Sequence, residues 1–93
     1  MKKILVVGYT PYGYMRDLTE SYPDVMWFEE NHVGYSGAAS IVELVGMFDG
    51  IMFTENSRDN LAWEVACVMN KVNIIDKKDY SLKKEENKEG NHE

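Results

Sequence analysis

Cysteine, proline and long apolar runs are all scarce in this chain of 93 residues. A single cysteine, Cys67, excludes a disulfide framework and a metal site built from several thiolates. No apolar run approaches the length of a membrane-spanning helix. The apolar run Ile4–Val7 follows two lysines, as in an export signal, but it is too short, and Gly8 comes directly after it. We therefore expect a first strand at this position and a cytoplasmic protein without a membrane segment.

Positive charge is also sparse, because the formal net charge is -6 and the lysines are scattered. Proteins that bind duplex nucleic acid neutralise its phosphates with a basic stripe, which this sequence lacks. Duplex nucleic acid is therefore an unexpected partner. A small nucleotide-like molecule needs only a few hydrogen-bond donors and stays open as a ligand.

The chain is long enough for one small domain. Residues 76–93 are dominated by Lys, Glu, Asn and Gly, and their apolar residues are Tyr80 and Leu82. Such a segment buries too little surface to offset its ordering entropy. We predict an α/β domain over residues 1–75 and a disordered charged tail over residues 76–93. A folded unit of that size is near the lower limit for a stable monomer, so a homo-oligomer is expected.

Short apolar runs alternate with helix-forming segments along residues 1–75. Continuous apolar runs are typical of parallel strands that are buried on both faces. We place strands at Ile4–Val7, Val25–Phe28, Gly50–Phe53 and Val72–Ile75, and helices between consecutive strands. With right-handed crossovers, this alternation predicts a small flavodoxin-like or Rossmann-like parallel sheet of four strands, in the order 2-1-3-4, with helices on both faces.

The third helix, which ends at Asn70, contains Trp63 and Cys67. A helical wheel predicts that its core face is centred near Val65, with contributions from Leu61, Ala62, Val68 and Met69. Trp63 then points away from the core. An outward tryptophan favours an oligomer contact, although a ligand wall or simple exposure would place it there as well.

The loop between the third strand and the third helix is the first candidate binding segment. Ligands of parallel α/β sheets bind at the carboxyl ends of the strands. Polar side chains gather in this loop and at the start of the helix: Glu55, Asn56, Ser57, Asp59 and Asn60. Glu64 follows one to two turns into the helix, where its carboxylate could serve as acid, base or nucleophile. An ordinary solvated glutamate would occupy the same position.

The loop after the first strand is the second candidate, because Gly8 is followed by Tyr9, Tyr12 and Tyr14. A tyrosine offers a base or ribose a stacking face and a hydroxyl. Tyr12 or Tyr14 could instead pack beneath the first helix. The glycine spacing matches neither GxGxxG nor a P-loop, so a dinucleotide cofactor is not expected.

Glu29, Glu30 and His32 lie just past the second strand, but they are too few to define a metal site. We therefore expect no bound metal and no cofactor.

The stretch from Asp49 to Ile75 resembles the nucleoside 2-deoxyribosyltransferase superfamily. That family has an Asp-Gly pair, an apolar strand, a polar loop with a glycine, a glutamate followed by alanine, and a second apolar strand. The corresponding segments here are Phe48–Phe53, Glu64–Cys67 and Asn70–Ile75. The opening Lys3–Tyr9 is similar to the family's first strand. This chain has Arg58 where the family has Ser or Asp, and Asn60 where it has glycine.

The resemblance implies that Glu64 is a nucleophile that attacks the anomeric carbon of a nucleoside and forms a glycosyl-enzyme ester. It also implies that Tyr9 or Tyr12 orients this carboxylate. A carboxylate suits such chemistry because it stabilises an oxocarbenium-like transition state. Three functions stay open: transfer or hydrolysis of an N-glycosidic bond, binding of a nucleotide-like ligand without catalysis, and protein interaction through the helix of Trp63.

Overall fold

The computed structural model describes residues 1–30, 37–55, 58 and 60–82. Its elements follow in the order β1 (Lys2–Val7), α1 (Tyr14–Ser21), β2 (Val25–Glu29), α2 (Gly37–Val45), β3 (Gly50–Phe53), α3 (Asn60–Asn70), β4 (Asn73–Ile75) and a short 3₁₀ helix (Lys77–Tyr80). All the strand pairs are parallel, and the sheet order is β2-β1-β3-β4. The predicted fold class and strand order are confirmed.

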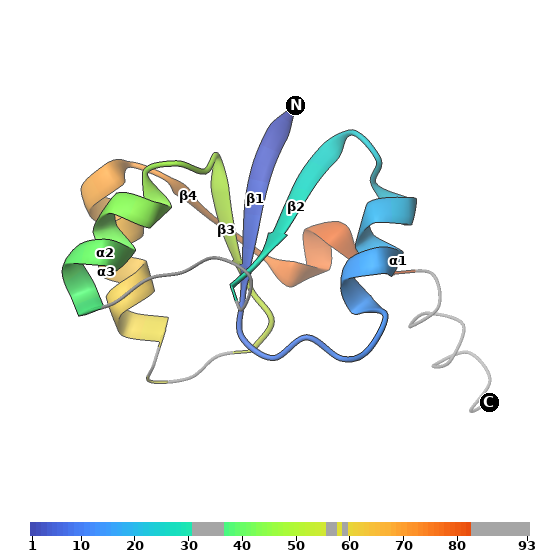
Figure 1. Cartoon of the computed structure of the whole chain (residues 1–93), viewed down its shortest axis with the longest axis horizontal. Coiled ribbons are helices and arrows are strands. Elements are labelled where there is room, and N and C mark those ends of the chain that lie inside the picture. Colours follow the sequence, from blue (N-terminus) through green and yellow to red (C-terminus); the bar gives the residue numbers. More distant parts are fainter. Residues whose placement is uncertain (31–36, 56–57, 59, 83–93) are drawn as a thin grey trace.

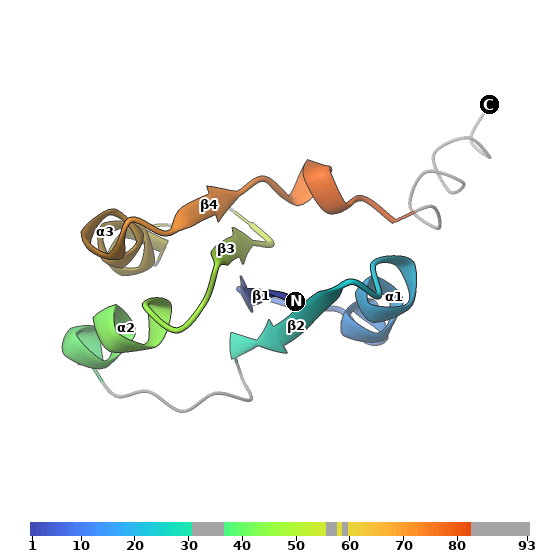
Figure 2. The same ribbon diagram turned by 90° about the horizontal axis from the view of Figure 1, so that it is seen from above.

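The sheet separates two apolar layers (Figures 1 and 2). On one face, α2 and α3 pack over Leu5, Val7 and Ile51. On the other face, α1 covers Ile4, Val6 and Met52 through a cluster that includes Leu18. Successive residues of β1 therefore serve opposite layers, as the alternation of side chains along a strand requires.

The chain continues in contact with the α1 face beyond β4. Leu82 is 4% exposed in the cluster of α1, and the Tyr22 hydroxyl donates a 2.6 Å hydrogen bond to the Ser81 carbonyl. Tyr80 meets the rings of Tyr22 and Trp27 edge to face, with centroids 5.0 Å away in each case. We expected the folded unit to end at residue 75, but the described structure continues it to Leu82. The two apolar residues of the segment supply the burial that its composition alone did not suggest; residues 83–93 lie outside the described part.

The predicted orientation of α3 is wrong. Trp63 is 4% exposed and lies in the core with Ala66 and Cys67, whereas Leu61 and Val68 are 64% and 75% exposed. Asn60 and Asn70, at the two ends of α3, lie on the same inner face as Trp63, and their amides are hydrogen-bonded there. Asn60 Nδ2 donates to the Glu55 carbonyl at 2.7 Å, and Asn70 Nδ2 to the Val42 carbonyl at 2.8 Å. Satisfied amides allow the inner face to be partly polar.

The carboxyl end of α3 is closed by backbone hydrogen bonds. Val72 N–H donates to the Cys67 carbonyl at 2.9 Å, and Lys71 N–H to the Val68 carbonyl at 3.2 Å. Lys71 takes a left-handed conformation with φ 56°. This is a Schellman motif, which turns the chain from α3 directly into β4.

Candidate functional site

The carboxyl ends of β1, β2 and β3 are connected to one another by hydrogen bonds. Gly8 N–H donates to Glu30 Oε1 at 3.0 Å, and Thr54 N–H donates to the Val7 carbonyl at 3.0 Å. Gly8 has φ 114°, and a Cβ at this position would collide with Thr54 Oγ1. Glycine therefore allows the three strand ends to meet closely at the edge where parallel sheets bind ligands.

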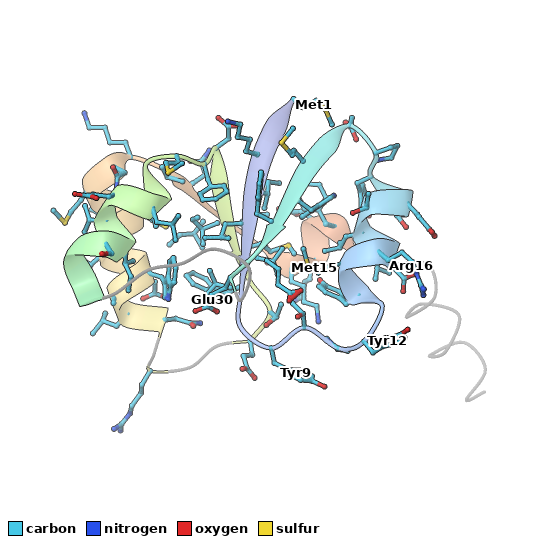
Figure 3. All side chains as sticks on the ribbon, in the orientation of Figure 1. Met1, Tyr9, Tyr12, Met15, Arg16 and Glu30 are labelled. Atoms are coloured by element: carbon cyan, nitrogen blue, oxygen red, sulfur yellow. The ribbon has the colours of Figure 1, made fainter. Side chains whose placement is uncertain are left out.

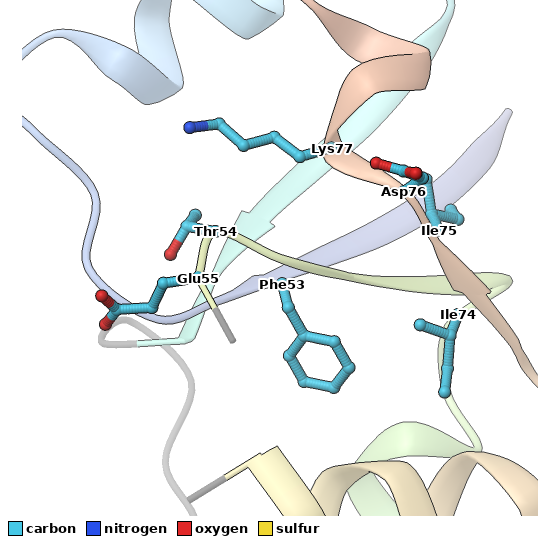
Figure 4. A pocket seen from close by; sticks show the side chains of 7 residues that line it. All are labelled: Phe53, Thr54, Glu55, Ile74, Ile75, Asp76 and Lys77. Carbon is cyan, nitrogen blue, oxygen red and sulfur yellow. The ribbon is translucent and has the colours of Figure 1, made fainter. Parts of the chain in front are cut away.

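A cavity of about 370 Å³ opens at the ends of β3 and β4 (Figure 4). It is lined by Phe53, Thr54, Glu55, Ile74, Ile75, Asp76 and Lys77. Phe53 and Ile74 point toward the helices of one sheet face, whereas the Lys77 side chain extends on the opposite side (Figure 4). The cavity thus combines an apolar wall with a hydroxyl, an ammonium and two carboxylates.

The polar groups of this cavity are held by their neighbours. The carbonyl of Glu55 accepts the buried amide of Asn60, which fixes the loop where it leaves β3. Asp76 Oδ1 accepts a 2.9 Å hydrogen bond from Lys78 N–H and caps the short 3₁₀ helix. Lys77 Nζ lies 5.5 Å from the centroid of the Tyr14 ring, within range of a cation–π interaction. The ammonium is therefore positioned by an aromatic face.

A second cavity, of about 380 Å³, lies beside the loop after β1. Tyr12, Arg16 and Glu29 are among its lining residues. The Tyr12 side chain is fully exposed, and Tyr9 is 71% exposed; both point outward from the loop (Figure 3). Tyr14 differs from them because it is buried beneath α1. The sequence allowed Tyr14 either to contact a ligand or to pack beneath the first helix, and the structure shows the packing.

Glu64, the expected nucleophile, is exposed on α3. It does not line the cavity between β3 and β4, and neither does Tyr9. Its charge reaches Cys67, since burial first and the nearby Glu64 carboxylate second raise the pKa of that thiol. Cys67 is 1% exposed and stays protonated at neutral pH, which excludes it as a ready nucleophile.

The structure therefore brings only some of the sequence-predicted site residues to the carboxyl edge of the sheet. Gly8 and Glu55 lie at the carboxyl edge, and Asn60 supports Glu55 from a buried position. The expected ligand contacts at Asn56, Ser57 and Asp59 lie outside the described residues. Sequence reasoning missed Asp76 and Lys77, which directly follow β4; the rule applied to the end of β3 would have identified them had the tail not been placed at residue 76.

Among the described side chains, no group of three or more His, Cys, Asp or Glu residues is placed to hold a metal ion. Within the same part of the chain, every helix is too short or too polar to cross a membrane. Comparisons with protein-family models, curated proteins and solved structures gave no significant match for this chain. The candidate site therefore rests on its own geometry.

Proposed function

We propose that this protein binds an uncharged, hydroxyl-bearing ligand of the nucleoside class in the cavity between the ends of β3 and β4. The composition of that cavity carries the proposal. Its volume of about 370 Å³ lies in the lower part of the range of roughly 300–1,000 Å³ that small-molecule sites occupy. A single nucleoside suits this size better than a dinucleotide.

The charges of the cavity favour a nucleoside over a nucleotide. Glu55 and Asp76 can accept hydrogen bonds from sugar hydroxyls, and Phe53 offers an apolar surface to a base. The two carboxylates outnumber the Lys77 ammonium, so a phosphate group would meet net repulsion. The preferred ligand is therefore neutral and polyhydroxylated.

The test is calorimetric titration of the full chain with adenosine, uridine and their 2′-deoxy and 5′-phosphate forms. Binding of a nucleoside, with weaker binding of its 5′-phosphate, is the expected result. Glu55→Gln should weaken binding roughly tenfold, because it replaces a charge-assisted hydrogen bond by a neutral one. Glu43→Gln is the matched control, since Glu43 is exposed on α2 and should leave affinity unchanged. Equal affinities for Glu55→Gln and the parent would overturn the assignment to this cavity.

Cleavage or transfer of an N-glycosidic bond by Glu64 is the second candidate function. Its support is that Glu64 is exposed in the first half of α3, the helix that follows β3 at the ligand-binding edge. Because Glu64 does not line the cavity, the nucleoside would have to extend beyond the cavity to reach this carboxylate. Glu64→Gln should then abolish release of free base while nucleoside binding persists. Equal base release by parent and variant would exclude the nucleophile, and binding without any base release would leave the protein a binder.

A further inference from the structure

The outer face of α3 is apolar although it faces solvent. Leu61, Val65, Val68 and Met69 are 64%, 49%, 75% and 64% exposed. Their spacing of four, seven and eight residues from Leu61 places them on one stripe of the helix. The sequence Asn60–Asn70 contains one charged residue, Glu64. Most solvent-facing helices present charged and polar side chains instead, so this stripe is unusual.

The stripe lies on a helix that packs against the edge of the sheet. β4 pairs with β3 and ends the strand order, so its outer edge has no strand neighbour among the described residues. α3 packs against β4, and Ile74 of β4 is 49% exposed. The helix and the edge strand share one border of the molecule (Figures 1 and 2).

The exposed surface is large for a chain of this size. The four stripe residues form a patch that exposes on the order of 450 Å², within the range of about 300–600 Å² that the largest apolar patch of a typical monomer covers. A standard interface buries roughly 800 Å² on each partner, so this patch would supply about half of that area and a polar rim the rest.

Two other candidates for covering the patch, the segment after Leu82 and a membrane surface, fit it poorly. The sequence after Leu82 contains no apolar side chain, and Leu82 itself packs on the opposite face of the sheet, with α1. A membrane surface is disfavoured because interfacial helices carry Lys or Arg on their polar face, and α3 has neither.

We propose that a second copy of this chain covers the patch and forms a two-fold symmetric dimer through the outer face of α3. A two-fold axis brings the same patch of both copies together. Leu61 and Met69 are each four residues from Val65, so an antiparallel pair of α3 helices centred on Val65 would place Leu61 of one copy beside Met69 of the other. Glu64 lies on the flank of the stripe, where its charge stays hydrated.

Sedimentation equilibrium of the full chain at tens of micromolar tests the dimer. The parent should sediment at twice its mass of 10.7 kDa. Met69→Glu should raise the dissociation constant at least roughly tenfold by placing a charge in the apolar contact. The matched control is Met26→Glu, since Met26 is 40% exposed on β2, the opposite edge strand. A monomeric parent, or a dimer weakened by Met26→Glu and not by Met69→Glu, would overturn the proposal.

Cross-linking gives a readout that does not depend on a destabilising charge. Val65→Cys should be joined to its symmetry mate by a short thiol-specific cross-linker, because the axis passes near this position. The control is Tyr12→Cys, because Tyr12 is fully exposed in the loop after β1. This variant should not be cross-linked and should run as a monomer on denaturing gels. The native Cys67 is buried and adds little background. Cross-linking at Tyr12→Cys equal to that at Val65→Cys would contradict the symmetric contact.

Discussion

At the scale of single residues, Gly8 is a position at the carboxyl edge of the sheet that has no room for a side chain. Its φ of 114° and its closeness to Thr54 Oγ1 both disfavour any side chain. Gly8→Ala should therefore lower the free energy of unfolding by about 2–4 kcal/mol, through backbone strain and a steric collision. Urea denaturation followed by tryptophan fluorescence measures this loss.

Gly13→Ala is the comparison for Gly8→Ala. Gly13 also has a positive φ, 83°, but a Cβ there would meet the flexible end of Arg16 at 3.0 Å. It should cost about 1–2 kcal/mol, the strain of a left-handed alanine alone. Equal losses at the two glycines would show that the Thr54 contact is unimportant.

Cys67 provides a prediction of pH dependence. Burial, followed by the charge of Glu64, raises the pKa of its thiol in the folded state. The unfolded chain therefore loses this proton first as pH rises, and the stability contributed by the thiol is intact below the ordinary thiol pKa. It declines above that value, up to the higher pKa of the folded state.

Urea titrations across the alkaline range should accordingly show a steeper loss of stability for the parent than for Cys67→Ala. Every other ionisable group is present in both proteins, so the difference between the two slopes isolates the thiol. Parallel slopes would mean that the thiol titrates alike in both states. Glu64→Gln should reduce the slope in part, because burial remains the larger cause.

At the scale of elements, the segment after β4 holds α1 and β2 together. Tyr80 packs edge to face on Tyr22 and Trp27, and the next residue accepts the Tyr22 hydroxyl. Tyr80→Ala should cost about 2–4 kcal/mol of unfolding free energy, because a half-buried ring and its aromatic contacts are lost. Tyr12→Ala removes the same atoms from a fully exposed position and should change stability by less than about 0.5 kcal/mol. Similar effects of the two substitutions would mean that the segment contributes little.

At the scale of the whole molecule, the proposed dimer links stability to concentration. A partner that binds only the folded chain stabilises it by mass action. The parent's melting temperature should therefore rise by several degrees as concentration is increased tenfold, whereas that of Met69→Glu should stay constant. Calorimetric scans over the concentration series measure the melting temperatures of both proteins. A melting temperature of the parent that does not change with concentration would argue against the dimer.

The sheet could be predicted because its strands are separate apolar runs. Their alternation with helices predicts parallel strands, and right-handed crossovers favour the observed strand order. The sequence did not predict the orientation of α3, since that helix is apolar on two faces and only tertiary packing selects the one with Trp63. Prediction of the site residues was limited in the same way, by tertiary packing that the sequence does not show. Gly8 and Glu55 could be placed by their position after strands, but the contribution of Asp76 and Lys77 depends on two apolar side chains that anchor the following segment.

The central position of β1 has a consequence for synthesis on the ribosome. β1 is made before both of its neighbours, which begin at Val25 and Gly50, so its two pairing edges stay unpaired until those strands are synthesised. During that interval Ile4–Val7 is an uncovered, β-prone run of the type that nucleates aggregation. Lys2 and Lys3 precede it directly and remain exposed in the folded protein. We expect their charges to repel other nascent chains and so to protect the strand from aggregation until β3 is made.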